Sequence, residues 1–232
     1  MPISLLFVKH LRYVVLRGKI GGIDMRKLFT IMGKASTGKD TLTKMLHEKM
    51  ELPIALSFTT RPMRNGETQG VEYDFITEKD FWDMHGCDLL AEYTSYDVAG
   101  GETWYYGLTR EELEKSDYVL VIVNPDGFNQ IKEIYGDKVC SILIDAPADV
   151  RIKRYLDRDI VTETKAEECC RRFLADQKDF KDMVTNYTVM NIGELETVYK
   201  ELESKIRMEL AKDILVKVDE KFRDNPRRFL CR

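Results

Sequence analysis

Histidine is scarce in this chain, and its cysteines show no metal-binding pattern. There are three histidines, far apart in sequence, and five cysteines with no C-x-x-C pair (Cys87, Cys140, Cys169, Cys170 and Cys231). The chain therefore lacks the ligand spacing of a zinc site and the even cysteine set typical of a disulfide framework. Unpaired thiols are typical of reducing compartments, so we expect a cytoplasmic protein.

Long apolar runs and an excess of one charge are also missing. No segment approaches the length of about 20 apolar residues that a membrane-spanning helix needs. The formal net charge at pH 7 is −4, and no basic run stands apart from acidic neighbours. Nucleic-acid-binding proteins present a concentrated positive face. The composition therefore disfavours both a membrane and a nucleic acid as partners.

Residues 1–24 precede the first recognisable structural pattern. They hold an apolar run at 3–8 that is followed by basic residues, the reverse of the order in a signal peptide. Gly21 and Gly22 can be encoded by a purine-rich ribosome-binding sequence just before Met25. We interpret this N-terminal extension as a translated leader, with a genuine N-terminal arm as the alternative. The intact mass of protein made from the native gene distinguishes the two.

A glycine-rich segment lies between a predicted strand at 28–32 and a predicted helix that begins near Thr41. Its sequence, G-K-A-S-T-G-K-D, departs from the phosphate-binding pattern G-x-x-x-x-G-K-[ST] only at the last position. The glycines let backbone amides surround phosphate oxygens, and the lysine reaches the terminal phosphates. We therefore expect this chain to bind a nucleotide through Gly33, Lys34, Ala35, Ser36, Thr37, Gly38, Lys39, Asp40 and Thr41.

The departure from the pattern is Asp40, which stands where a hydroxyl normally ligates Mg²⁺. A carboxylate is also a hard oxygen ligand, so Asp40 is predicted to bind the metal ion. The alternative is a tolerated substitution, with Mg²⁺ held mainly by phosphates and water.

Apolar runs alternate with helical patterns from residue 25 onward, which predicts an α/β fold with a parallel core sheet flanked by helices. Residues 57–108 interrupt the alternation, are rich in Thr, Gly, Arg and Tyr, and are predicted to form an inserted substrate-binding lobe. We expect one domain over 25–210 and a polar tail over 211–232. The expected strands are 28–32, 53–58, 118–123, 139–144 and 187–191; the expected helices are 41–50, 78–85, 126–135, 148–156, a long one ending near 182, and 194–210.

Two arginines in the predicted lobe, Arg61 and Arg64, flank Pro62 and Met63. Guanidinium groups bind phosphate oxygens through two parallel hydrogen bonds and stay charged when water is excluded. Tyr73 and Tyr106 can add phenolic hydroxyls to the same phosphate. Alone, such arginines are usually surface ion pairs; beside a phosphate loop they indicate a second phosphate site.

With these motifs in place, the chain resembles the guanylate kinases over residues 26–207. The resemblance rests on the phosphate loop, S-x-T-T-R-x-x-R-x-G-E from Ser57, G-x-x-Y at 70–73, Y-Y-G at 105–107 and the closing V-x-N strand. It implies a P-loop nucleoside-kinase fold with a lid over 154–172, ATP and Mg²⁺ as cofactors, and a nucleoside monophosphate as the substrate.

The resemblance also implies roles for single residues. Arg61, Arg64, Tyr73 and Tyr106 would hold the phosphate of the acceptor, and Ser57 and Glu92 would face its base. Arg154, Arg158 and Arg172 match lid arginines that reach the ATP phosphates, with Arg171 as the alternative to Arg172. Asn191 matches the residue beside the adenine of ATP.

Three residues differ from the family pattern, at positions that in the family contact the base or lie near the metal ion. Leu108 stands where the family has Ser or Thr, and Ile122 and Asn124 stand where it has Asp. Lost polar contacts weaken discrimination between bases. The predicted reaction is phosphorylation of GMP or dGMP by ATP, with a kinase for another monophosphate as one alternative. A non-catalytic interaction module is the other, although the intact Gly33, Gly38 and Lys39 argue against it.

Overall fold

The computed structural model describes residues 27–64, 66–97, 101–157 and 163–224. The leader interpretation for residues 1–24, the predicted lid residue Arg158, and Cys231 therefore lie outside the described residues. The four cysteines within the described ranges, Cys87, Cys140, Cys169 and Cys170, are free thiols.

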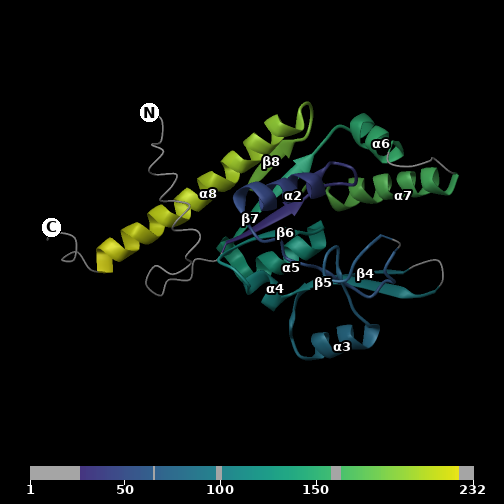
Figure 1. Cartoon of the computed structure of the whole chain (residues 1–232), viewed down its shortest axis with the longest axis horizontal. Helices are drawn as coiled ribbons and strands as arrows, with labels where there is room; N and C mark the ends of the chain where they lie inside the picture. The colour runs from purple at the N-terminus through teal and green to yellow at the C-terminus, as the bar shows by residue number, and fades with distance from the viewer. Residues whose placement is uncertain (1–26, 65, 98–100, 158–162, 225–232) are drawn as a thin grey trace.

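A four-stranded parallel sheet forms the centre of the fold (Figure 1). Its order is β6-β1-β7-β8, so the first strand of the chain lies in the middle of the sheet and its neighbours are joined by crossover helices. The predicted α/β class and parallel core are therefore confirmed. The four strands are β1 (Lys27–Met32), β6 (Tyr118–Ile122), β7 (Val139–Asp145) and β8 (Tyr187–Met190).

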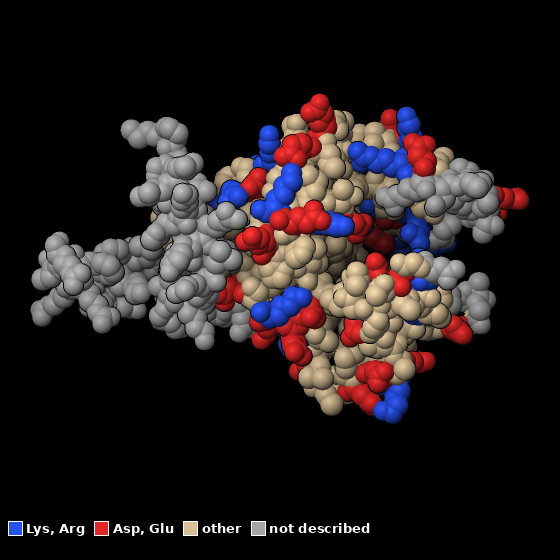
Figure 2. Space-filling model, viewed as in Figure 1, with Lys and Arg blue, Asp and Glu red and all other residues tan. Residues whose placement is uncertain are grey.

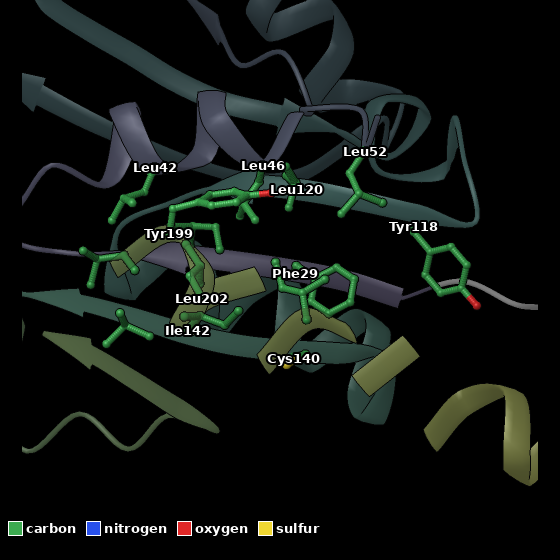
Figure 3. Packing of buried hydrophobic residues seen from close by; sticks show 14 of the residues in the cluster. Phe29, Leu42, Leu46, Leu52, Tyr118, Leu120, Cys140, Ile142, Tyr199 and Leu202 are labelled. Carbon is green, nitrogen blue, oxygen red and sulfur yellow. The ribbon is translucent and has the colours of Figure 1, made fainter. Parts of the chain in front are cut away.

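Helices cover both faces of this sheet. On one face α2 (Lys39–Met50) and α8 (Leu195–Asp224) bury Phe29 and Ile142 together with Leu42 and Leu202 (Figure 3). On the other face α5 (Pro125–Tyr135) packs on the sheet through Ile131. Continuous apolar strands are expected for a parallel sheet that is covered on both sides. Helix α8 continues to Asp224, beyond the end that the sequence predicted near residue 210.

The predicted inserted lobe folds around a second sheet with the order β3-β2-β5-β4, below the core in Figure 1. Phe81 anchors the helix of this lobe, because it is fully buried and stacks on Tyr105 with ring centroids 4.1 Å apart. Helix α4 (Arg110–Glu114) leads back to the core. The lobe comprises β2 (Phe58–Thr59), β3 (Asp74–Phe75), α3 (Glu78–Gly86), β4 (Leu90–Asp97) and β5 (Thr103–Thr109).

The prediction of a strand over 53–58 is wrong. This segment touches the core sheet at one bridge, where Ile54 pairs with Leu120. The amide of Leu56 then donates to the carboxylate of Glu112, 2.7 Å away, and Phe58 joins the second sheet. The apolar run therefore crosses from one sheet to the other, so it cannot form a continuous ladder with either.

Two further helices lie beside the start of α2, at the right of Figure 1. They are α6 (Ala148–Leu156), which matches the expected helix, and α7 (Glu163–Asp179), which begins within the predicted lid segment 154–172. A short 3₁₀ helix, η1 (Gly136–Lys138), precedes β7. Among the helices that the structure describes, none has the length and apolar character needed to cross a membrane.

Candidate active site

The predicted phosphate loop connects the end of β1 to the first residue of α2. Ser36 and Gly38 adopt left-handed backbone conformations, with φ of 62° and 85°. A Cβ atom at Gly38 would collide with the side-chain amide of Asn191, so only glycine fits there. The amides of Gly38, Lys39 and Asp40 donate to no other described residue. These amides lie at the N-terminus of α2, where a phosphate group binds favourably.

The two charged residues that begin α2 lie side by side. Lys39 Nζ is 3.6 Å from Asp40 Oδ2, and the Asp40 side chain is 72% exposed. The pKa of Tyr73, in the lobe, is raised mainly by burial, with a further contribution from the negative charge of Asp40.

Asn191 and Arg154 brace the phosphate loop from the carboxyl edge of the sheet. Asn191 is buried, and its Nδ2 donates to the carbonyl of Thr37 at 2.7 Å. Arg154 donates to the same carbonyl at 3.3 Å and to the carbonyl of Asn191 at 3.1 Å. The structure thus brings both sequence-predicted residues to the loop. The predicted place of Asn191 beside adenine stays a prediction.

Arg172, one of the two candidates for the third lid arginine, lines a shallow pocket with Ala35 and Ser36, between the loop and helices α6 and α7. The choice between Arg171 and Arg172 stays a prediction.

The paired arginines of the lobe are organised by a carboxylate to which the sequence assigned no role. Arg61 is 4% exposed, and its two Nη atoms donate to Glu67 at 2.8 and 2.6 Å. The amide of Arg64 donates to the same carboxylate at 2.8 Å. The hydrogen bond from Arg61 is the largest cause that lowers the pKa of Glu67, to about 2. Glu67 belongs to the conspicuous R-x-x-R-x-G-E segment, so its position in the motif was the available signal.

The predicted phenols gather around Arg61. The ring centroids of Tyr73 and Tyr106 are 5.9 Å apart, and the Arg61 guanidinium lies 5.2 Å from the centroid of Tyr73. Arg64 is exposed beside them. The Nε edge of Arg61 makes no hydrogen bond to another residue in the described ranges, so it can still donate to an anion. All four predicted phosphate-binding residues therefore lie in one region.

Glu92 is buried at the edge of the lobe, where little of its side chain reaches solvent. It is 7% exposed, and burial raises its pKa to about 8. A Cβ atom at Gly127 would lie 2.6 Å from Glu92 Oε2, so the start of α5 can approach the carboxyl group only through a glycine. Asn124 caps this helix by accepting from the Gly127 amide at 2.7 Å, and its Nδ2 donates to Tyr96 at 3.3 Å. Ser57 is half-buried just before β2.

Neither residue after the Y-Y-G motif offers a free hydroxyl. Leu108 is fully buried in the core beneath α5. Thr109 caps α4, because its side chain accepts from the amide of Glu112 at 3.2 Å. The polar contact expected of this family is therefore missing at position 108, and its neighbour does not replace it.

A metal ion would have few protein ligands here. Across the described ranges, no group of three or more His, Cys, Asp or Glu side chains is arranged to hold a metal ion. The exposed carboxylate of Asp40, next to Lys39, fits a Mg²⁺ ion that keeps water ligands and binds through one carboxylate and substrate phosphates.

The space-filling view shows a hollow between the core and the inserted lobe. In Figure 2 this hollow lies at the right of the view, between the core above and the lobe below, and both basic and acidic side chains border it.

Comparisons with known proteins agree with these observations. The family model described as guanylate kinase matches residues 25–209. The guanylate kinase of Mycoplasma pneumoniae is 30% identical over 71% of this chain and 71% of its own length. That of Nitrosomonas europaea is 30% identical over 82% of this chain and 93% of its own length. The crystal structure of guanylate kinase from Anaplasma phagocytophilum has a TM-score of 0.54 at 18% identity, covering 80% of this chain and 87% of that chain. This last likeness concerns the fold alone.

Proposed function

This chain belongs to the guanylate kinase family, and from that membership we propose that it transfers the γ-phosphoryl group of Mg-ATP to GMP or dGMP. The observation that carries the proposal is that the chain has two separate clusters suited to phosphate groups. One is the set of open amides of the loop at 38–40, and the other is Arg61 with Tyr73 and Tyr106.

Positioning and charge neutralisation supply most of the catalysis in such a transfer. Arg61, fixed by Glu67, presents its free edge to the acceptor phosphate, and Arg64, Tyr73 and Tyr106 complete that site. Lys39 neutralises charge on the terminal phosphates of ATP. No general base is needed, because the acceptor phosphate is already ionised at neutral pH.

Arginines from the lid add positive charge on the ATP side. Arg154 already lies on the carbonyls of Thr37 and Asn191, and Arg172 lines the pocket beside Ser36. Arg158 is assigned to the same group from the family pattern. Closure of the lid over 154–172 would exclude water that could otherwise hydrolyse ATP.

When bound, Mg²⁺ would supply positive charge that neutralises the phosphates of ATP. Asp40 is the protein ligand we assign to it, replacing a carboxylate that the family carries at the position of Asn124. In this structure the side chain of Asn124 is used to cap α5 and to contact Tyr96, which agrees with that exchange.

Glu92 and Ser57 are the residues we assign to the base. A carboxylate accepts from the N1 and N2 donors of guanine, whereas adenine presents no matching pair of donors. The buried position of Glu92 strengthens such a contact and penalises a base that leaves it unpaired.

The decisive experiment offers GMP, dGMP, AMP, dAMP, CMP, UMP and dTMP separately with Mg-ATP and measures nucleoside diphosphate formation. Preferential turnover of GMP or dGMP supports the proposal. Preference for another base keeps the two phosphate sites and overturns the substrate. ATP binding without any turnover favours the non-catalytic interaction module instead.

A further inference from the structure

Two charged residues with no role in the reaction above hold the third residue of the phosphate loop. The amide of Ala35 donates to Asp176 Oδ2 at 2.7 Å, and its carbonyl accepts from Arg151 Nε at 2.9 Å. Arg151 Nη2 donates to the same Asp176 oxygen at 2.6 Å. These contacts fix the peptide units on both sides of the Ala35 Cα atom. We call Arg151 and Asp176 the Ala35 clamp.

Arg151 is buried and Asp176 is half-buried, which strengthens the hydrogen bonds of the clamp. The side chain of Arg151 is 3% exposed and that of Asp176 is 17% exposed. Phe173 covers the guanidinium, with its ring centroid 5.1 Å away. Charge-assisted hydrogen bonds in such a place are strong, and loss of one partner leaves the other charge buried and unpaired.

The residue after the clamp is strained. Ser36 has a φ of 62°, a left-handed conformation that residues with a side chain adopt at a cost. Its buried hydroxyl has no hydrogen-bond partner among the residues that the structure describes, so no side-chain bond offsets this cost. Strained backbone persists where its surroundings over-determine it. The carbonyl that Arg151 holds belongs to the peptide unit from which the φ of Ser36 is measured.

Helix α6 holds the loop on both sides of Ser36. Arg151 contacts the carbonyl of Ala35, and Arg154, one turn later, contacts that of Thr37. Asp176 reaches the loop from α7, beyond the C-terminal end of the predicted lid segment 154–172. The clamp thus joins the phosphate loop to α6 and α7, two helices that each contain part of that segment.

We propose that Arg151 and Asp176 are positioning residues that offset the strain at Ser36 and hold the phosphate loop in its binding conformation before ATP arrives. This inference rests on the proposed function only in that ATP is the ligand of the loop. Pre-ordering a loop increases affinity because less conformational entropy is lost on binding.

The first test measures ATP and GMP binding by titration calorimetry. Asp176→Ala and Arg151→Lys should each weaken ATP binding about tenfold, the effect of losing a hydrogen bond to a charged group, and should change GMP binding less than twofold. Lysine keeps the charge of Arg151 but not its fork of donors. Asp179→Ala and Lys153→Ala, exposed charges on the same two helices, are matched controls and should bind ATP like the parent. Unchanged ATP affinity in both clamp variants overturns the proposal.

The second test separates positioning of the loop from simple attachment of α6 to α7. Ser36→Gly removes the left-handed strain, so Asp176→Ala should weaken ATP binding less than about threefold in that background. An undiminished tenfold loss in the Ser36→Gly background overturns the assigned role of strain. Asp176→Asn, which keeps the shape of the side chain, takes the place of Asp176→Ala if the alanine variant does not fold.

The third test does not depend on nucleotide. Hydrogen exchange of the nucleotide-free protein should show a protected Ala35 amide, and Asp176→Ala should accelerate its exchange at least about tenfold. Unaltered exchange contradicts the clamp even if the protein is an active kinase. Conversely, a chain that phosphorylates no monophosphate but shows this acceleration overturns the proposed function and leaves the clamp supported.

Discussion

Leu108 lies directly opposite Glu92 in the antiparallel pair of β4 and β5. Residues paired in this way project their side chains from the same face of the sheet. Leu108 is fully buried and Glu92 is 7% exposed. An apolar side chain therefore stands next to the carboxyl group at the position where the family has a hydroxyl. Burial beside an apolar side chain disfavours the ionised carboxylate, and this burial raises the pKa of Glu92.

The first prediction concerns the pH dependence of GMP binding. With a pKa of about 8, Glu92 is neutral at pH 7 in the free protein and must lose its proton to accept from guanine. GMP affinity should therefore rise with pH up to about 8, by up to about tenfold per unit, and level off above it. Calorimetry in buffers of different ionisation enthalpy should detect a proton released on binding at pH 7. Glu92→Gln should bind GMP weakly, without this release.

The ionisation of Glu92 also determines whether the free energy of unfolding rises or falls with pH. The folded pKa of Glu92 lies above its unfolded value of 4.5, so its contribution is fully present below pH 4.5 and is lost as pH rises to about 8. The free energy of unfolding of the parent should fall over this window relative to that of Glu92→Gln. Parallel curves for the two proteins would show that Glu92 ionises normally.

The second prediction concerns Leu108 itself. Leu108→Ser removes a fully buried side chain and should lower the free energy of unfolding by about 3 kcal/mol. The new hydroxyl can donate to the carboxylate, so the midpoint of the GMP pH profile should move below 8. Leu108→Ala creates a similar cavity without a hydroxyl and serves as the control. If both variants shift the midpoint equally, hydration of the cavity is the cause.

The third prediction tests how Glu67 fixes the acceptor site. Glu67→Gln keeps the shape of the side chain but removes the charge that holds both Nη atoms of Arg61. We expect the KM for GMP to rise about tenfold while the KM for ATP stays unchanged. Glu72→Gln, an exposed change in the same lobe, is the matched control. Equal loss toward both substrates would point to general damage to the fold instead.

The fourth prediction concerns the metal ion. If Asp40 supplies a ligand to Mg²⁺, Asp40→Ala should raise the Mg²⁺ concentration for half-maximal activity by about tenfold, and Asp40→Ser should lie between this variant and the parent. Glu48→Ala removes another exposed carboxylate of α2 and should leave this concentration unchanged. Mg²⁺ dependence that is identical in all four proteins refutes the assignment of Asp40.

The sequence predicted best what depends on contiguous residues. The phosphate loop, the buried strands beside it and the arginine motif of the lobe are local patterns, and the structure brings their residues together as expected. The Ala35 clamp was not predictable in this way, because Asp176 accepts a hydrogen bond from the amide of a residue 141 positions away in the sequence. Arg151 and Asp176 look like ordinary charged residues of helices. The prediction of a strand at 53–58 failed because an apolar run does not show that its first half pairs with the core sheet and its second half with the sheet of the lobe.

The last prediction tests the chemistry most directly. Lys39 begins α2 beside the open amides of the loop, and its Nζ is the cation best placed to meet the terminal phosphates. Lys39→Met keeps much of the apolar stem and removes the charge, so kcat should fall on the order of 10³-fold with little change in thermal stability. Lys44→Met, on the same helix and 74% exposed, is the matched control and should retain full turnover. A Lys39→Met protein that still converts GMP at the parent rate would contradict the assignment of Lys39 as the residue that neutralises the transferred group.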